Sequence, residues 1–343
     1  MQRVLTCMTI GMVFTLVMSS ASIAADKVYT LKIADSFPIK HPMGEVVNHF
    51  MEAAKKESGG KLDFQYFPAQ QLGKLHDLLK ICQLGMTDIA YVGPTFFPGQ
   101  LGLNTVVALP FWDSAKQGSA IYLELVKQSK EIQKEWADNR VRPVFVSATS
   151  QYEVGTGTKQ VVRIADLSGL RMKTPGGIFD NIAKRYGIVP VAMSFNEAYE
   201  AIQRNIIDGA VQTLPSVKGY RLFEVEKHHV AGLRMGGYIS TYVINDKALR
   251  KLPEDVKQTL FRAGESTTVF AAELWDTMNA SLVRTFEDQG MQFFNIPEDK
   301  KPEWLAPLKG IEEEWIAEYG KKGKPARAVY EHFRKITEKV VSQ

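Results

Sequence analysis

Two short strand patterns inside residues 164–215 constrain the fold of this chain more than any other feature. Residues 170–172 form the first, between a helical turn and a Pro-Gly-Gly turn at 175–177. Residues 208–212 form the second, which continues an amphipathic helical pattern at 195–203. Open α/β sheets bind their ligands beyond the carboxyl ends of the strands. The loops that end these two strands are therefore candidate places for a small-molecule site.

A regular alternation of strand and helix patterns near the start of the chain predicts a sheet covered by helices. Strand patterns occupy residues 28–34, 62–66 and 88–92. Helical spacing of apolar residues fills 43–54 and 75–84 between them. This β-α-β-α-β order indicates a parallel or mixed sheet with helices on both faces.

The rest of the chain predicts a second lobe that is connected to the first at several points. Residues 141–148 have the pattern of a buried strand, and the polar segment 147–158 is expected to cross between lobes. Residues 239–244 alternate like a strand that returns to the first sheet. From Pro253 the chain is almost wholly helical, and one apolar stripe continues to Met278, which suits a helix that bridges both lobes. Hinge bending of such a clamp closes its cleft around a solute.

The first 24 residues have the pattern of a cleaved secretory signal peptide. Arg3 supplies a positive start, residues 4–18 are apolar, and residues 22–24 form a small-x-small cleavage site. An uncleaved anchor helix is the alternative, and the cleavage site directly after the apolar run argues against it. Cys7 lies inside that run rather than at its end, so the pattern favours a soluble exported protein over a lipoprotein.

Composition and motifs argue against nucleic-acid binding and against enzyme chemistry. The formal net charge is +4, and the charges are spread without basic runs or aromatic-basic interleaving. The sequence contains no GxGxxG, P-loop, HExxH or GxSxG motif, and none of its six histidines pairs with Cys or Asp at metal-ligand spacing. We therefore expect no nucleic-acid partner, no metal, no cofactor and no catalytic site.

Many short motifs in a fixed order connect the chain to one known family. The most specific are Asp166-Leu167-x-Gly169-Leu170 and Ala198-Tyr199-x-Ala201-Ile202-Gln203 followed by Asp208-Gly209. Further motifs lie at residues 31–34, 41–42, 58–61, 66–73, 84–88, 109–111 and 252–255. With them the chain resembles the solute-binding proteins of tripartite ATP-independent periplasmic (TRAP) transporters, of the dicarboxylate-binding-subunit type. The resemblance covers nearly the whole chain after the signal peptide.

This resemblance implies a fold and a role. The fold would be a two-lobe periplasmic-binding-protein clamp of the α/β class, with a mixed β-sheet in each lobe, hinge strands and a long helix bridging the lobes. Lobe I would comprise residues 25–150 and about 239–280, and lobe II residues 151–238 and about 281–343 with the C-terminal helices. The role would be to capture a small-molecule solute in the periplasm and deliver it to TRAP-type membrane permease subunits, without ATP hydrolysis. The resemblance leaves open whether the protein is a monomer or a dimer.

The resemblance also implies ligand-binding residues. The family's carboxylate-binding arginine corresponds to Lys173, which keeps the charge but lacks the planar fork. The family's asparagine after Asp-Gly corresponds to Gln212, which has the same donors and acceptors on a longer arm. Phe195 corresponds to an aromatic residue that packs against ligands, and Arg234 to a position near the hinge that is usually histidine. The first hypothesis is therefore a small organic acid held by Lys173 and Gln212, with Arg234 as a further positive charge.

Glu153 motivates a different ligand. Several acid-binding members of the family have a second cation about twenty residues upstream of the arginine position, where this chain has Glu153. A carboxylate among aromatic rings suits an ammonium group, so the alternative ligand is an amine, an amino alcohol or a zwitterion. The rings expected near it are those of Tyr152, Phe179, Phe195 and Tyr238. A structural ion pair between Glu153 and Lys173 is also open. An exported enzyme on a two-lobe scaffold is the hypothesis of another class.

Overall fold

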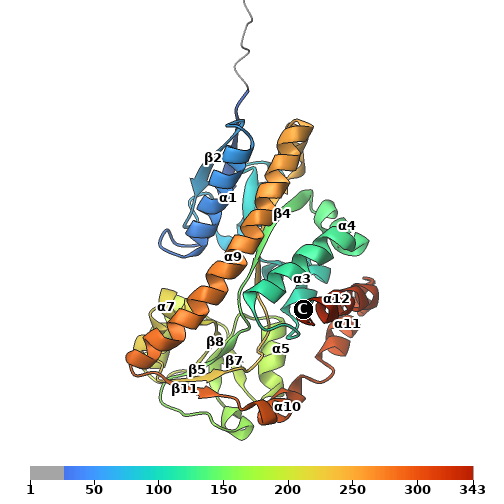
Figure 1. Ribbon diagram of the computed structural model, residues 1–343. Helices are drawn as coiled ribbons and strands as arrows, with labels where there is room; N and C mark the ends of the chain where they lie inside the picture. The colour runs from blue at the N-terminus through green and yellow to red at the C-terminus, as the bar shows by residue number, and fades with distance from the viewer. Residues whose placement is uncertain (1–26, 343) are drawn as a thin grey trace, which may run out of the picture.

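Residues 27–342 are described by the computed structural model of this chain, in which two lobes lie one above the other (Figure 1). The expected signal peptide at residues 1–24, including Cys7, lies outside this part of the chain. Each lobe contains one mixed β-sheet flanked by helices. The two-lobe α/β class predicted from the sequence is confirmed.

The sheet of the first lobe has the strand order β2-β1-β3-β10-β4. Its strands are β1 (Tyr29–Ala34), β2 (Leu62–Phe67), β3 (Ile89–Val92), β4 (Val141–Ala148) and β10 (Ile239–Asn245). β1 runs parallel to β2 and β3, whereas β10 runs antiparallel to β3 and β4. The strand that returns from the second lobe is thus inserted into the middle of the first sheet.

Helices cover this sheet because their apolar residues recur at helical spacing. In α1 (Met43–Glu57) the buried residues are Met43, Val46, Val47, Phe50 and Ala54. The other helices of the lobe are α2 (Leu78–Leu84), α3 (Ala115–Gln128), α4 (Lys130–Asp138) and α8 (Asp246–Arg250). Ser114 and Ser129 cap α3 and α4, each accepting a backbone N–H of the first turn with its side-chain oxygen.

The sheet of the second lobe has the strand order β11-β9-β5-β8-β6-β7. Its strands are β5 (Glu153–Thr156), β6 (Arg171–Lys173), β7 (Val189–Val191), β8 (Gly209–Gln212), β9 (His228–Ala231) and β11 (Gln292–Asn295). β6 and β8 run parallel to each other, and β5 runs antiparallel to β8. The carboxyl ends of β6 and β8 and the start of β5 therefore meet at one edge of the sheet.

Four helices pack around the second sheet: α5 (Ile178–Arg185), α6 (Phe195–Gln203), α7 (Leu214–Gly219) and α10 (Lys301–Leu305). α6 begins with a capping box, in which Ser194 Oγ accepts from the Glu197 backbone N–H and the Glu197 carboxylate accepts from the Ser194 N–H at 2.7 Å. This box fixes the start of α6, and Phe195 is its first residue.

Two extended segments and one long helix connect the lobes near the hinge. Residues 149–152 and 232–238 run side by side, and the Tyr152 N–H donates to the Gly236 carbonyl at 2.9 Å. Helix α9 (Glu254–Asp288) has 35 residues and packs on α1, α3 and β4 of the first lobe and on α7 of the second. Figure 1 shows it running diagonally across both lobes. The predicted bridging helix is thus present.

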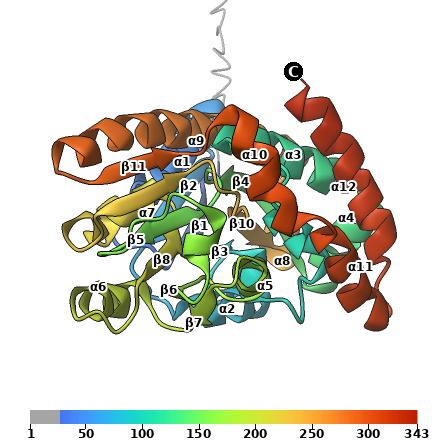
Figure 2. The same ribbon diagram turned by 90° about the horizontal axis from the view of Figure 1, so that it is seen from below.

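The C-terminal helices differ from the expected boundaries. We assigned residues about 281–343 to the second lobe, and β11 and α10 do lie there. However, α11 (Ile311–Lys321) packs on α12 (Ala326–Val341), and α12 packs on α3 of the first lobe. Figures 1 and 2 both show these two helices beside α3 and α4. The chain therefore crosses between the lobes a fourth time, between α10 and α11.

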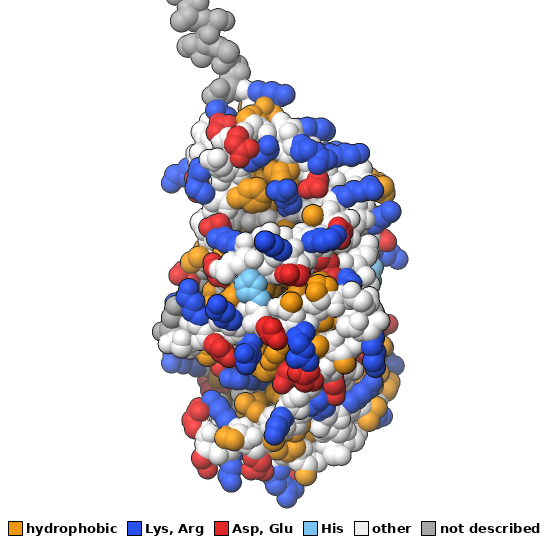
Figure 3. All heavy atoms as spheres, turned by 90° about the vertical axis from the view of Figure 1, so that its right-hand side faces the viewer, with side chains coloured by type: hydrophobic (Ala, Val, Ile, Leu, Met, Phe, Trp, Pro, Cys, Tyr) orange, Lys and Arg blue, Asp and Glu red, His pale blue; other side chains and the backbone are white. Residues whose placement is uncertain are grey.

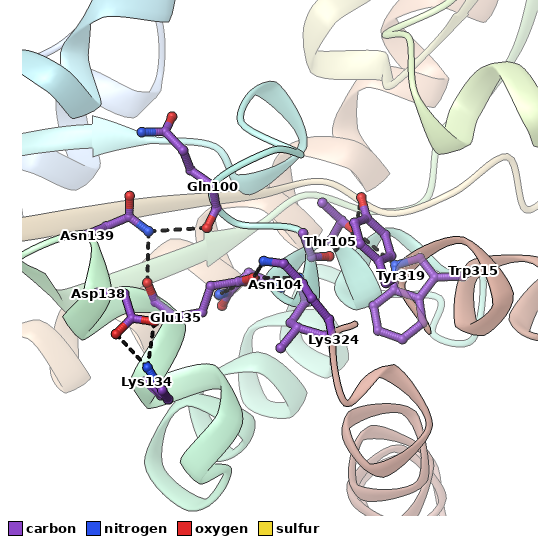
Figure 4. Close-up of polar contacts among 12 residues, drawn as sticks. Gln100, Asn104, Thr105, Lys134, Glu135, Asp138, Asn139, Trp315, Tyr319 and Lys324 are labelled. Carbon is purple, nitrogen blue, oxygen red and sulfur yellow. Dashed lines mark hydrogen bonds and ion pairs between the residues drawn. The ribbon is translucent and has the colours of Figure 1, made fainter. Parts of the chain in front are cut away.

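Buried polar contacts hold the C-terminal helices on the first lobe. The Glu135 carboxylate accepts from the backbone N–H groups of Leu103 and Asn104 at 3.1 and 3.0 Å, and it also pairs with the Lys324 ammonium. Figure 4 shows this network together with Trp315, whose indole N–H donates to Thr105 Oγ1 at 2.9 Å. An amphipathic pattern shows which face of a helix is buried but not what covers it, so this placement was not predictable from the sequence.

The described helices and one face of the molecule bear on membrane and polyanion binding. None of the helices described within residues 27–342 is both long and apolar enough to cross a membrane. On the face seen in Figure 3, cationic and anionic side chains are interspersed over both lobes. That face therefore has no extended patch of one charge sign.

Candidate ligand-binding site

The sheet geometry brings the predicted site residues to the edge of the second lobe where the crossing segments join it. Lys173 is the last residue of β6 and Gln212 the last of β8, and Lys173 is in register with Ala210. Glu153, the first residue of β5, is directly opposite Gln212. Tyr152 precedes it on the crossing segment. This edge is where an α/β sheet binds small molecules.

Lys173 is a buried cation without a partner among the described residues. Its side chain is only 5 % exposed, and no hydrogen bond or ion pair to it is found within residues 27–342. The ammonium lies over the Phe195 ring, 3.4 Å from the ring centroid. Burial lowers the pKa of Lys173 to about 7, although the nearby Asp180 carboxylate acts in the opposite direction. An anion placed here would supply the missing countercharge.

Arg171 does not share this site, although it lies on the same strand. Its backbone N–H and its guanidinium contact the Asp208 carboxylate, at 2.8 and 3.3 Å. Lys159 contacts the other oxygen of Asp208 at 3.2 Å. The hydrogen bonds of Asp208 thus fix the start of β6 against β8 and leave Lys173 as the cation at the opposite end of the strand.

Gln212 is buried, and its amide nitrogen is bound within the protein. The Gln212 Nε2 atom lies 2.7 and 2.6 Å from the two carboxylate oxygens of Glu226. Burial raises the pKa of Glu226 to about 8, so the carboxyl group is largely neutral at pH 7. Gly155 makes room for it, since a Cβ there would lie 2.3 Å from a Glu226 oxygen. Only Oε1 of Gln212 is left without a partner in the described structure.

Both oxygens of the Glu153 carboxylate have partners within the second lobe. One of its oxygens lies 2.9 Å from His229 Nε2, and the other accepts from the Gly232 backbone N–H at 2.6 Å. Both oxygens therefore serve to hold β5 against β9 and the start of the crossing segment. The ion pair with Lys173, which the sequence left open, is not formed.

Arg234 is also engaged elsewhere. Its Nε and Nη2 atoms each lie 2.7 Å from one oxygen of Asp113, in a bidentate pair. Asp113 belongs to the first lobe, whereas Arg234 lies on the crossing segment after β9. In this structure Arg234 is a brace at the hinge rather than a second positive charge for a ligand.

The predicted aromatic residues fall into two groups: Tyr152, Phe179 and Tyr238 pack together as buried core residues, whereas Phe195 lies apart from them and is only partly buried. The ring centroids of Tyr152 and Phe179 are 4.9 Å apart, and those of Tyr152 and Tyr238 are 6.4 Å apart. Phe195 stacks on Tyr220, with the ring centroids 4.9 Å apart. Tyr220 was not predicted from the sequence. Burial raises the pKa of the Tyr152 phenol, and the neighbouring Tyr220 adds to that effect. Tyr220 thus extends the aromatic surface that Phe195 forms beneath Lys173.

Gln151 is a second residue that sequence reasoning missed. Its Oε1 atom accepts from the Gly236 N–H at 3.2 Å, whereas its buried Nε2 atom has no partner in the described structure. Its position before Tyr152 in a polar crossing segment was the only available signal. It offers a hydrogen-bond donor at the hinge.

A pocket of about 230 Å³ lies between the lobes, beside this edge. Thr95 and Pro98 of the first lobe, Gly177 and Ile178 of the second, and Trp315 and Tyr319 of α11 are among its lining residues. Gly177 belongs to the Pro-Gly-Gly turn that follows Lys173. Lys173 itself is not in the lining, so the pocket is adjacent to the site rather than identical with it. No group of three or more His, Cys, Asp or Glu residues suitable for a metal occurs within residues 27–342.

Comparisons with curated proteins agree with this architecture. The sialic acid-binding periplasmic protein SiaP of Vibrio cholerae is 24 % identical over 292 residues, which cover 79 % of this chain and 84 % of that protein. The C4-dicarboxylate-binding periplasmic protein DctP of Rhodobacter capsulatus is 22 % identical over 284 residues, which cover 81 % and 84 %. The chain is therefore similar in length and sequence pattern to known periplasmic binding proteins.

Solved structures show the same fold. A TRAP solute-binding protein from Rhodoferax ferrireducens in complex with copurified benzoate superposes with a TM-score of 0.82 at 22 % identity, covering 92 % of this chain and 99 % of that one. A TRAP periplasmic solute-binding protein from Bordetella bronchiseptica with bound mandelate has a TM-score of 0.79 at 22 % identity, covering 91 % and 99 %.

A profile of one family matches most of the chain. It describes bacterial extracellular solute-binding proteins of family 7 and covers residues 33–318, which include both sheets and helix α9. Together with the two-lobe fold and the TRAP proteins that share it, this match shows that the chain belongs to family 7 of the bacterial extracellular solute-binding proteins, the solute-binding proteins of TRAP transporters.

Proposed function

We propose that this protein captures a small organic acid in the periplasm and delivers it to a TRAP-type permease, with Lys173 as the anion-binding residue. The observation that carries the proposal is the buried, unpaired ammonium of Lys173 at the carboxyl end of β6. A buried charge without a partner is costly, and an anionic ligand removes that cost. The pattern of residues 1–24 supports export.

The ligands of related structures support an acid. Benzoate, mandelate and β-D-galacturonate occur in TRAP solute-binding proteins with this fold, and each carries a carboxylate. An amine ligand has less support, because both oxygens of Glu153 already have partners. Lobe closure then follows a population shift, since the closed form gains contacts from both lobes only when solute is present.

A thermal-shift screen of the chain from Ala25 onward, refolded to remove copurified solute, tests this proposal. Ligands that bind the native state raise the melting temperature by mass action. We expect shifts with carboxylates and none with amines of matched size. Lys173→Met should abolish the shift, whereas Lys218→Met, at an exposed lysine of α7, should retain it. A shift with amines alone, or an unchanged shift in Lys173→Met, would contradict the proposal.

A further inference from the structure

The site offers one positive charge. Lys173 is the only Lys or Arg that is buried among residues 27–342. The other cation expected near the ligand, Arg234, is paired with Asp113. The upstream position that is cationic in several relatives is Glu153, a carboxylate bound to His229. A second carboxylate on the ligand would therefore be buried without a countercharge, at a large cost in free energy.

The remaining polar groups at this edge are mostly engaged with one another. Gln212 pairs with Glu226, Glu153 with His229, and the Thr174 hydroxyl donates to Asp180. Within the part of the chain that the structure describes, the unpaired buried atoms of these residues and of Gln151 are Gln151 Nε2, Gln212 Oε1 and His229 Nδ1. A ligand with many hydroxyl groups would leave most of them without partners, which argues against a sugar acid.

A stack of two aromatic rings lies next to the lysine ammonium. Phe195 lies directly beneath the ammonium, and Tyr220 stacks on Phe195 with an interplanar angle of 20°. Phe195 begins α6 and Tyr220 directly follows α7, and both rings are only partly buried, so a ligand can reach them. A planar apolar ligand body packs well against such faces and edges.

We propose that the ligand is an aromatic monocarboxylate, whose carboxylate pairs with Lys173 and whose ring packs against Phe195 and Tyr220. This inference rests on the proposed function and narrows it to one substrate class. The carboxylate supplies the only countercharge that the site requires. An aromatic ring needs no hydrogen-bond partners, whereas the hydroxyl groups of a sugar acid or a second carboxylate do.

Isothermal titration with four matched acids and one amine tests the inference: benzoate, cyclohexanecarboxylate, succinate, galacturonate and benzylamine. Benzoate should bind most tightly. Cyclohexanecarboxylate has the same charge and nearly the same size without the aromatic face, and we expect it to bind roughly two- to tenfold more weakly. Succinate and galacturonate should bind at least roughly a hundredfold more weakly, because they bring a second charge or hydroxyl groups into the ring-lined region.

The possible outcomes distinguish a wrong ligand class from a wrong function. Tighter binding of succinate or galacturonate would overturn the aromatic class while leaving an organic-acid function intact. Equal affinity for benzoate and cyclohexanecarboxylate would also overturn it. Binding of benzylamine with no binding of any acid would overturn the proposed function itself.

Variants at Phe195 locate the origin of the selectivity. Phe195→Leu should lower the ratio of benzoate to cyclohexanecarboxylate affinity, and Phe195→Tyr should preserve it. Phe261→Leu is the matched control, because Phe261 is a half-buried phenylalanine on α9 in the first lobe. A ratio that is unchanged in Phe195→Leu and in Phe195→Tyr would contradict the assignment of Phe195.

Discussion

Gln212 and Glu226 are buried side by side, with the amide nitrogen of one 2.7 and 2.6 Å from the two carboxyl oxygens of the other. The resemblance to the family implies that the glutamine position contacts the ligand, but in this structure the Gln212 amide nitrogen is bound to Glu226. The pair also places a titratable group where burial opposes its charge.

The first prediction concerns the pH dependence of stability. Burial raises the pKa of folded Glu226 from 4.5 to about 8. As pH rises, the unfolded chain loses this proton before the folded chain does. The contribution of Glu226 to the free energy of unfolding is therefore fully present below about pH 4.5 and is lost as pH approaches 8. Glu226→Gln should therefore unfold with less pH dependence and be more stable than the wild type at pH 8.5, by up to about 5 kcal/mol. Urea unfolding at pH 5, 7 and 8.5 measures this pH dependence.

Glu200→Gln, at an exposed glutamate, is the control and should follow the wild type. An identical slope for Glu226→Gln and wild type would show that Glu226 is charged in the folded state.

The second prediction concerns the pH dependence of ligand affinity. The pKa of Lys173 in the empty protein is lowered to about 7, so the ammonium that binds an anion is lost above that pH. Affinity for benzoate should be constant from pH 5.5 to 6.5 and fall by up to about tenfold per pH unit above 7.5. Lys173→Arg should bind with little pH dependence, because a guanidinium stays protonated. Repeating the titration in Glu226→Gln removes the second group that titrates in this range. Affinity that stays constant to pH 9 in the wild type would contradict the lowered pKa.

The third prediction tests the role of Arg234 as a brace. The Arg234–Asp113 pair is partly exposed, with 30 % and 56 % of the two side chains accessible. Such pairs contribute about 0–1 kcal/mol to stability. Arg234→Gln should change the free energy of unfolding by no more than that and leave benzoate affinity within about threefold. Calorimetric titration of Arg234→Gln and Asp113→Asn checks both. A hundredfold loss in Arg234→Gln alone would place the guanidinium in contact with the ligand.

The fourth prediction concerns the attachment of the C-terminal helices. Glu135 accepts from two backbone N–H groups and pairs with Lys324, and its side chain is 5 % exposed. Glu135→Ala removes an acceptor from these buried donors and should destabilise the protein by about 2–4 kcal/mol. Limited proteolysis should then cut first near residues 309–325. Lys134→Met, which removes an exposed pair with Asp138, should stay within about 0.5 kcal/mol of the wild type. Wild-type resistance to proteolysis in Glu135→Ala would mean that apolar contacts alone hold α11 and α12.

The fold was largely predictable because its elements carry local signals. The apolar spacing of α1 and the long stripe of α9 gave the helices, and Pro-Gly-Gly after β6 gave the turn behind Lys173. The placement of α11 and α12 was not predictable, because it depends on contacts such as Trp315 with Thr105 that join distant parts of the chain.

The sequence predicted which residues come together at the candidate site only in part, and their roles in ligand binding stay predictions. Lys173 and Phe195 are in contact, with the ammonium 3.4 Å from the ring centroid. The partners of Glu153 and Arg234, which are His229 and Asp113, could not be predicted because they lie far away along the chain. The charge of a residue at a family position therefore does not predict a role in ligand binding until the contacts of that residue are known.

The link between α10 and α11 limits how far the lobes can separate. Arg185 of the second lobe donates to the carbonyls of Pro307 and Lys309, at 2.6 and 2.9 Å, and pairs with Glu314. A few residues later Trp315 is fixed to Thr105 of the first lobe. The chain between these anchor points is too short to lengthen much, since a residue spans at most about 3.6 Å. This link therefore limits how far the two lobes can move apart in the ligand-free protein. The limit also sets the largest solute that can enter the cleft, unless the contacts of Arg185 or Trp315 break.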